Sequence, residues 1–143
     1  MSDRTLTADG YRALAEFRYQ IWQFIQFSEK AVRSARLNPQ HHQLLLALKG
    51  IPKGLLPSIN EIARRLHLRH HSVVELTNRL TARGLIRKRQ DSSDRRRVLL
   101  EITARGEAVL RKLSLIHRAQ LEFLGRDLIK ALQKLLINRT RTS

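Results

Sequence analysis

The sequence predicts a mainly α-helical fold with a small β-hairpin, in which a winged helix-turn-helix is joined to N- and C-terminal dimerisation helices. Two observations predict it. Apolar residues recur at helical spacing along most of the 143 residues, and only three Pro and six Gly interrupt them. Two short strand-like segments, 85–89 and 98–102, directly follow a pair of short helices and enclose a polar turn. A hairpin in this place is the wing of a winged helix-turn-helix.

The first helix is predicted over residues 11–36, which lack Gly and Pro. Its apolar face is formed by residues three or four apart: Leu14, Phe17, Ile21, Phe24, Ser28, Ala31 and Ala35. Asn38 and Pro39 are a helix-start signal, because Asn caps a helix and Pro fits its first position. The helix they start extends to Lys49, and residues 50–57 form a loop because they contain two Gly and two Pro.

The helix–turn–helix is predicted from Ser58 to Gly84. Ser58 and Glu61 have the spacing of a capping box at the start of the first short helix. A break at 67–69 separates it from a second helix at 70–83, and Gly84 ends that helix in a left-handed conformation. Four residues form the inward face of the second helix: Val73, Leu76, Thr77 and Leu80.

The last helix begins after its cap, Thr103, and runs toward the C-terminus, with a point at Gly125 where it can break. Residues 138–143 are polar and basic and are predicted to fray. The predicted organisation is a dimerisation helix at 1–37, the winged lobe at 38–103, and dimerisation helices with a basic tail at 104–143. The terminal apolar helices have few partners within one chain of this size, which predicts a dimer.

Composition and charge narrow the classes of function. The 28 Lys and Arg exceed the 12 Asp and Glu by 16, an excess that favours a polyanionic partner. Half of that excess lies in residues 64–97, with eleven basic and three acidic side chains. The absence of Cys excludes disulfides, thiolate nucleophiles and thiol redox sensing. A polar start, at Ser2 to Arg4, and the lack of a long apolar run predict a cytoplasmic protein.

Several segments in order resemble the MarR family of winged-helix transcriptional regulators. They are residues 59–68 (INEIARRLHL), 70–80 (HHSVVELTNRL), 83–86 (RGLI), 94–103 (DRRRVLLEIT) and 105–107 (RGE). The most specific part is the Asp-Arg-Arg wing followed at a fixed distance by Ile-Thr and a Gly-Glu helix start. The similarity is dense over residues 38–110 and rests on architecture alone for the terminal helices.

The resemblance implies a homodimer whose first and last helices interlock and which offers two winged helices to a palindromic operator in double-stranded DNA. Most such proteins are repressors, and many release DNA when a small aromatic or phenolic effector binds between the dimer base and the DNA-binding lobe. We expect such a protein to be associated with the nucleoid. The absence of Cys excludes the peroxide-sensing branch of the family.

The second short helix is predicted to insert its N-terminal half into the major groove. The candidate contacts are His70, His71, Ser72, Val74, Glu75 and Asn78. Asn78 can pair with adenine, and Glu75 can accept from the amino group of cytosine. Alternatively, or in addition, Glu75 pairs with Arg79 four residues later on the same helix.

The wing, by resemblance to the family, is predicted to place Arg96 in the minor groove, with Asp94 holding it by a charge-assisted bond. Arg95 and Arg97 would meet phosphates. In an alternating strand these two share the face opposite Arg96, so the assignments can also be exchanged. Further phosphate candidates are Arg64, Arg65, Arg69 and Arg79, of which we expect at least one to face only solvent.

Histidine and tryptophan side chains suggest two other kinds of site. His67, His70 and His71 can cluster across a turn, but without Cys and with few carboxylates nearby we expect no metal and no cofactor. The candidate ligand cleft comprises Trp22, His41 and His42. For the two histidines the alternative is a surface position near the helix cap, and for Trp22 it is the dimer interface.

Three other classes of protein compete with a sequence-specific regulator. A non-specific DNA-binding or architectural protein is favoured by the net charge of +16. An enzyme is rejected because the sequence has no paired carboxylates at useful spacing, no nucleophile with an obvious base and no glycine-rich phosphate loop. A membrane-surface role needs a basic amphipathic helix, whereas the basic residues here gather on the hairpin and the second short helix.

Overall fold

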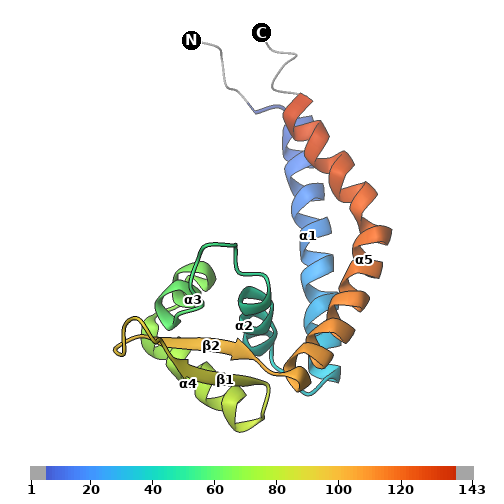
Figure 1. Cartoon of the computed structure of the whole chain (residues 1–143). Helices are drawn as coiled ribbons and strands as arrows, with labels where there is room; N and C mark the ends of the chain where they lie inside the picture. Colours follow the sequence, from blue (N-terminus) through green and yellow to red (C-terminus); the bar gives the residue numbers. More distant parts are fainter. Residues whose placement is uncertain (1–5, 138–143) are drawn as a thin grey trace, which may run out of the picture. The chain divides into compact units, whose positions relative to one another are not determined.

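The computed structural model describes residues 6–137, and over this range the chain forms five helices and one two-stranded antiparallel sheet (Figure 1). Their order is the predicted one, and the fold is a winged helix-turn-helix between two long helices. The elements are α1 (Ala8–Ser34), α2 (Pro39–Lys49), α3 (Ile59–Leu66), α4 (His70–Ala82), β1 (Ile86–Gln90), β2 (Val98–Ile102) and α5 (Ala104–Ile137).

Two compact units divide the chain. The lobe is Val32–Ser114, and the arm consists of residues 1–31 and 115–143, of which 6–31 and 115–137 are described. Each long helix contributes one end to the lobe and the other to the arm. The division predicted at 37/38 and 103/104 stays a prediction, and the predicted frayed tail lies outside the described residues.

The core of the lobe is built from side chains that are almost completely buried. They come from α2, α3, α4 and the hairpin: Leu44, Leu45, Ile62, Val73, Leu80, Ile86 and Leu100. Helix α2 starts as predicted, because the Asn38 side chain accepts from the His41 N–H at 2.8 Å and Pro39 occupies the first turn. No described helix is long and apolar enough to span a membrane.

The helix–turn–helix forms at the predicted residues. The Ser58 hydroxyl accepts from the Glu61 N–H at 3.1 Å, but the Glu61 carboxylate pairs with Arg64 at 2.6 Å, so among the described contacts only this half of the capping box is present. His67 ends α3 in a left-handed conformation with φ of 53°. Gly84, with φ of 71°, follows α4 as predicted.

The hairpin pairs Ile86 with Ile102 and Gln90 with Val98. Leu99 and Leu100 are both buried, so the alternation in the sequence does not divide β2 into one buried and one exposed face. The loop before α3 also contacts this strand: the Leu100 N–H donates to the Pro57 carbonyl at 2.8 Å, and Ser58 bridges to Leu99. This loop covers the second edge of β2.

Helix α5 begins in a close contact with the base of the hairpin. The Thr103 hydroxyl donates to the Gly84 carbonyl at 2.6 Å and accepts from the Gly106 N–H at 3.1 Å. A Cβ at Gly106 would lie 2.1 Å from the Leu85 carbonyl oxygen, so only glycine permits this approach. The predicted point of breakage at Gly125 was wrong: α5 is continuous there, because one glycine costs a helix only about 1 kcal/mol.

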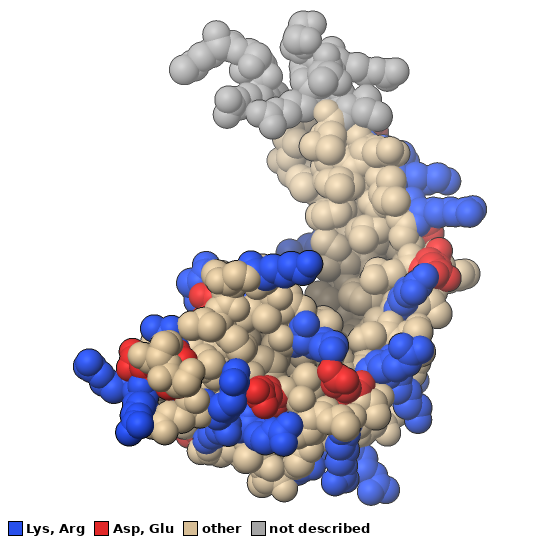
Figure 2. Space-filling view, viewed as in Figure 1, with Lys and Arg blue, Asp and Glu red and all other residues tan. Residues whose placement is uncertain are grey.

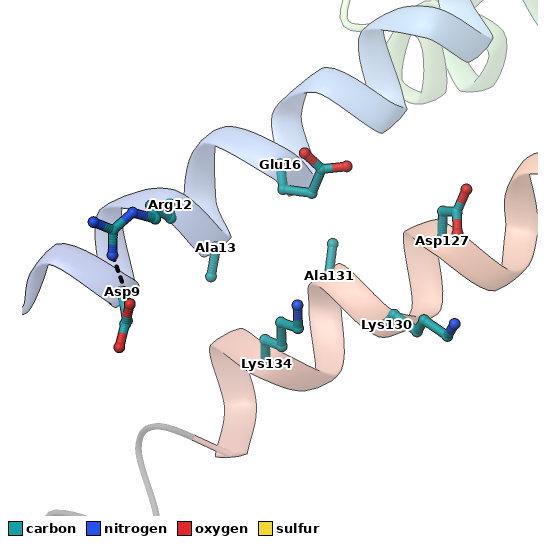
Figure 3. A pocket seen from close by; sticks show the side chains of 8 residues that line it. All are labelled: Asp9, Arg12, Ala13, Glu16, Asp127, Lys130, Ala131 and Lys134. Atoms are coloured by element: carbon teal, nitrogen blue, oxygen red, sulfur yellow. Dashed lines mark hydrogen bonds and ion pairs between the residues drawn. The ribbon is translucent and has the colours of Figure 1, made fainter.

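In the arm, α1 and α5 run side by side (Figures 1 and 3). The rings of Phe24 and His117 meet edge to face with their centroids 5.9 Å apart, and Ala13 and Ala131 are buried. Helix α1 starts at Ala8, three residues before the predicted start. The signal that the sequence reasoning missed is Thr7, whose hydroxyl accepts from the Gly10 N–H at 3.1 Å.

Candidate nucleic-acid interface

Helix α4 buries one side and exposes the other. Val73, Leu76, Thr77 and Leu80 are at most 4% exposed and fix the helix against the lobe. Of the six predicted groove residues, four are exposed and two, Ser72 and Val74, are half-buried; the exposed ones are His70, His71, Glu75 and Asn78. The lobe therefore presents a polar helical face to solvent, which carries both hydrogen-bond donors and hydrogen-bond acceptors.

Glu75 and Asn78, two residues of the groove face, differ in their contacts within the lobe. No ion pair joins Glu75 to Arg79 among the residues that the structure describes, so the Glu75 carboxylate is available to a partner. Lys88 on β1 donates to the Asn78 side-chain oxygen. The sequence reasoning counted Lys88 only as charge, because nothing in the spacing shows that β1 lies alongside α4. If Asn78 pairs with adenine through both amide atoms, its side-chain oxygen has to be shared between Lys88 and the base.

The wing turn is organised around Asp91, a residue that the sequence reasoning left out of the site. Its carboxylate is buried and accepts from both the backbone N–H and the hydroxyl of Ser93 at 3.0 Å. Asp91 also pairs with the Arg97 guanidinium at 3.6 Å. These hydrogen bonds, with the nearby arginines, hold the pKa of the Asp91 carboxyl below its ordinary value. The signal in the sequence is Asp followed two residues later by Ser, the pattern of an Asx-turn.

The four predicted wing residues lie together at this turn. Asp94 accepts from the Arg96 N–H at 3.0 Å, and its carboxylate lies 3.9 Å from the Arg96 guanidinium. The Arg96 side chain is 97% exposed. Arg97 instead bridges Asp91 and Asp94, while Arg95 is exposed and its carbonyl accepts from Gln90 at 2.8 Å. Arg95 and Arg96 are thus both presented to solvent, whereas Arg97 has a structural contact.

The predicted phosphate contacts differ in their surroundings. Arg64 and Arg65 share the Glu61 carboxylate, at 2.6 and 4.0 Å, and the hydrogen bond from Arg64 lowers the pKa of Glu61. Arg69 and Arg79 are exposed, and no ion pair involves either of them within the described part of the chain. Arg69 and Arg79 therefore keep their full charge for an external anion.

The charge is concentrated in the lobe. It holds 18 Lys and Arg against 6 Asp and Glu, a net charge of +12. Figure 2 shows Lys and Arg side chains around the wing tip at the left and again along the lower edge of the lobe. Among the described residues, no group of three or more His, Asp or Glu is placed to hold a metal ion, which means that His67, His70 and His71 do not form such a group.

The residues predicted for a ligand cleft lie in different units. Trp22 is exposed on α1 in the arm. His41 and His42 are both buried on α2 in the lobe, so the alternative of a surface position near the cap was wrong for them. Burial lowers the pKa of His41, and the positive charges of Arg83 and Arg79 lower it further. That these three residues bind a ligand stays a prediction.

A groove of about 570 Å³ lies between α1 and α5 in the arm (Figure 3). Ala13 and Ala131 approach each other across it. Six charged side chains from the two helices also line it, three of each sign: Asp9, Arg12, Glu16, Asp127, Lys130 and Lys134. It contains none of the predicted cleft residues. Its charged lining does not suit an aromatic effector, for which apolar walls are needed.

Comparison with known proteins finds a match to one family model and many solved structures of similar fold. The model of the MarR family matches residues 37–97. No curated protein matches the sequence. Among solved structures, AbsC, a MarR family transcriptional regulator from Streptomyces coelicolor, is 20% identical with a TM-score of 0.72, and the similarity covers 96% of each chain.

Two similar structures were determined with DNA. The S. aureus MepR–DNA complex is 21% identical with a TM-score of 0.68, covering 87% of this chain and 91% of the other. The transcriptional repressor CouR, bound to a 23-mer DNA duplex, is 28% identical with a TM-score of 0.65, covering 86% of this chain and 87% of the other.

Proposed function

Because the MarR family model matches residues 37–97, we propose that the chain is a winged-helix transcription regulator of this family, which binds double-stranded DNA in a sequence-specific manner and represses transcription. It acts as a homodimer on a palindromic operator, in the cytoplasm at the nucleoid. The observation that carries this proposal is that the polar face of α4 and the arginine wing are both exposed on the lobe, with Lys88 of the hairpin bonded to Asn78 of α4. The DNA-bound structures of MepR and CouR add support.

The roles of the side chains follow from their positions. The exposed N-terminal half of α4 enters the major groove, where Glu75 at its end and Asn78 in the next turn read base edges. Arg96 enters the minor groove, with Asp94 beside its guanidinium. Arg69, Arg79 and Arg95 contact phosphates, which fix the orientation of the protein without reading sequence.

The dimer is supported by a second apolar face on α5. One face is buried within the chain, through Leu113, His117, Leu124 and Ala131. Beside it, large apolar side chains recur at helical spacing but stay exposed: Leu121, Ile129, Leu132 and Leu136. A surface of this kind indicates an interface, and a second copy of the chain is the occupant that a palindromic operator requires.

A small aromatic or phenolic effector that releases the DNA completes the proposal, with Trp22, His41 and His42 as its candidate contacts.

The test is a fluorescence anisotropy titration at several salt concentrations, comparing DNA from upstream of this protein's own gene with a scrambled duplex. A preference of about 10³-fold or more for the natural DNA is expected of a specific regulator. Equal and steeply salt-sensitive binding to both duplexes would contradict specificity and favour an architectural protein. Footprinting should then show half-sites about 10 bp apart, or a multiple of that spacing.

Arg96→Ala tests the wing. Because the Arg96 side chain is almost fully exposed, its loss should leave the fold and the dimer intact while it weakens binding by about 1–3 kcal/mol. Arg12→Ala is the matched control, since Arg12 is also an exposed arginine beside a carboxylate, that of Asp9, but lies on α1 in the arm. Affinity that is equal in both variants would remove Arg96 from the interface.

A further inference from the structure

A second group of arginines lies on the lobe, away from the wing and the N-terminal half of α4. Arg36, Arg83 and Arg105 come from the segment before α2, the end of α4 and the start of α5. The Arg83 guanidinium donates to the Arg36 carbonyl at 2.7 Å. The Arg105 guanidinium lies beside Gly84, 3.9 Å from the position of a Cβ there. We call these three residues the second arginine cluster.

The charges of this cluster are not neutralised within the lobe. All three residues are exposed, and none of them forms an ion pair with a carboxylate within residues 6–137. Glu107, two residues after Arg105, pairs instead with Lys49 at 2.6 Å. The N-terminal end of α2, which carries a partial positive charge, begins at Pro39, three residues after Arg36. The three positive charges therefore stay available to an external anion.

The cluster continues the surface of α4. Glu75, Arg79 and Arg83 are four residues apart, so they follow one another along one side of that helix. Helix α4 has 13 residues and is therefore about 20 Å long at 1.5 Å per residue. The major groove is only about 12 Å wide. With its N-terminal half in the groove, α4 extends past the groove edge and brings Arg83 to the flanking sugar–phosphate backbone.

We propose that the second arginine cluster binds phosphates of the same DNA duplex, outside the stretch of major groove that α4 reads. This inference rests on the proposed function and extends the DNA-binding surface to the start of α5. Arginine suits the role because its planar guanidinium binds phosphate through two hydrogen bonds. Such contacts add affinity and fix orientation, but carry no sequence information.

The test is the double variant Arg36→Asn/Arg105→Gln. Asn is chosen at position 36 because that residue has φ of 61°, a left-handed conformation that Asn tolerates. Arg83 is kept, since its guanidinium holds the Arg36 carbonyl. Each lost phosphate contact lowers the slope of log affinity against log salt by about 0.9. We expect the slope to fall by about 2 and the affinity to fall about tenfold, equally on natural and scrambled DNA.

Lys53→Gln is the matched control, because it removes one exposed positive charge in the loop beyond the other end of α2. It should leave the slope unchanged. Arg105→Gln alone, which disturbs the least packing, should lower the slope by about 1 if the double variant does not fold. Wild-type slope and affinity in the folded variants would overturn the proposal, as would a loss confined to natural DNA.

These outcomes are separate from the failure of the proposed function. If the wild type binds natural and scrambled DNA equally, sequence-specific regulation fails, but the salt slopes on either duplex still show whether the cluster contacts phosphates. If the wild type binds neither duplex, both proposals are wrong.

Discussion

The lobe and the arm differ in net charge and in how fully their apolar side chains are buried. The lobe encloses most of its apolar side chains, with Leu46, Leu55 and Leu56 as its exposed large ones. It carries a net charge of +12, whereas the arm has a net charge of only +4, from 10 basic and 6 acidic residues. The arm also leaves large apolar side chains in solvent, with Phe123 78% and Trp22 57% exposed. The lobe is the more fully packed unit and has the larger excess of positive charge. The arm is nearly balanced in charge and leaves many more of its large apolar side chains exposed.

The difference shows what each unit needs from outside. A compact unit with excess positive charge is stabilised by an anion, and a pair of helices with a second apolar face is stabilised by another protein surface. The division also separates two kinds of mutation. Changes in the arm should affect assembly first, and changes in the lobe should affect its own fold or its affinity for DNA.

The largest effect is expected from the apolar face of α5. In Ile129→Glu/Leu132→Glu, two exposed apolar side chains in the arm become carboxylates. Each loses about 1.5–3 kcal/mol of apolar burial in a dimer, so the dimer dissociation constant should rise at least about a hundredfold. Sedimentation equilibrium measures it.

The control for this variant is Ala119→Glu, which adds a negative charge at an exposed position of the same helix outside that face. It should leave the dimer intact. Unchanged assembly of the double variant would show that this face of the arm is not the dimer interface, and the contrast between the two units would lose its explanation.

A pair of glycine substitutions compares the two units directly. Gly106→Ala places a Cβ against the Leu85 carbonyl oxygen and the Ile102 side chain in the lobe. We expect a loss of about 3 kcal/mol in the free energy of unfolding, because backbone must move. Gly125→Ala in the arm meets open space and should stabilise α5 by about 0.5–1 kcal/mol.

Urea denaturation of both variants, followed by circular dichroism, measures these changes. The opposite signs are the essential result. If Gly106→Ala were as stable as the wild type, the close approach of α5 to the hairpin base would not be a constraint on the fold.

Much of the fold could be predicted because local signals act over short distances. Asn38, Ser58 and Thr103 each cap the helix that the sequence assigned to them, and glycine at position 84 takes the left-handed conformation expected of it. The burial of α4 followed from helical periodicity alone. Breakage at Gly125 was a wrong prediction, because the packing of Leu124 and Ala131 outweighs the weak preference of one glycine.

The candidate site was harder to predict from the sequence than the fold, because its contacts join residues from different elements. Asp91 was counted only as a charge, although it organises the wing turn together with Ser93 and Arg97. The contact between Lys88 and Asn78 depends on where β1 crosses α4. The burial of His41 and His42 depends on what packs around α2, and no spacing in the sequence records that.

The smallest predicted effect is an order of events on acidification. His117, in the arm, has its pKa lowered by burial, although a hydrogen bond with the Ser28 backbone opposes this. The fold favours its neutral form, so its contribution is complete above pH 6.5, the ordinary histidine value, and is lost as the pH falls from there toward the folded pKa. Asp91, in the lobe, has a lowered pKa because its carboxylate accepts from Ser93. Its contribution is complete above pH 3.8, its ordinary value, and is lost as the pH falls through the folded pKa.

The arm should therefore loosen at a higher pH than the wing turn. Amide hydrogen exchange followed by NMR can measure both, at the N–H groups of α5 around His117 and at the Ser93 N–H, which Asp91 accepts. His117→Asn should remove the upper step in the arm, and Asp91→Asn should remove the lower step in the wing. His41 titrates in the lobe in the same direction as His117, so a global melting curve would mix the units, whereas residue-level exchange separates them. If exchange at Ser93 rose together with that of α5 as the pH fell below 6.5, the ordinary histidine value, the wing would not be held by Asp91, and the two units would respond to acid as one.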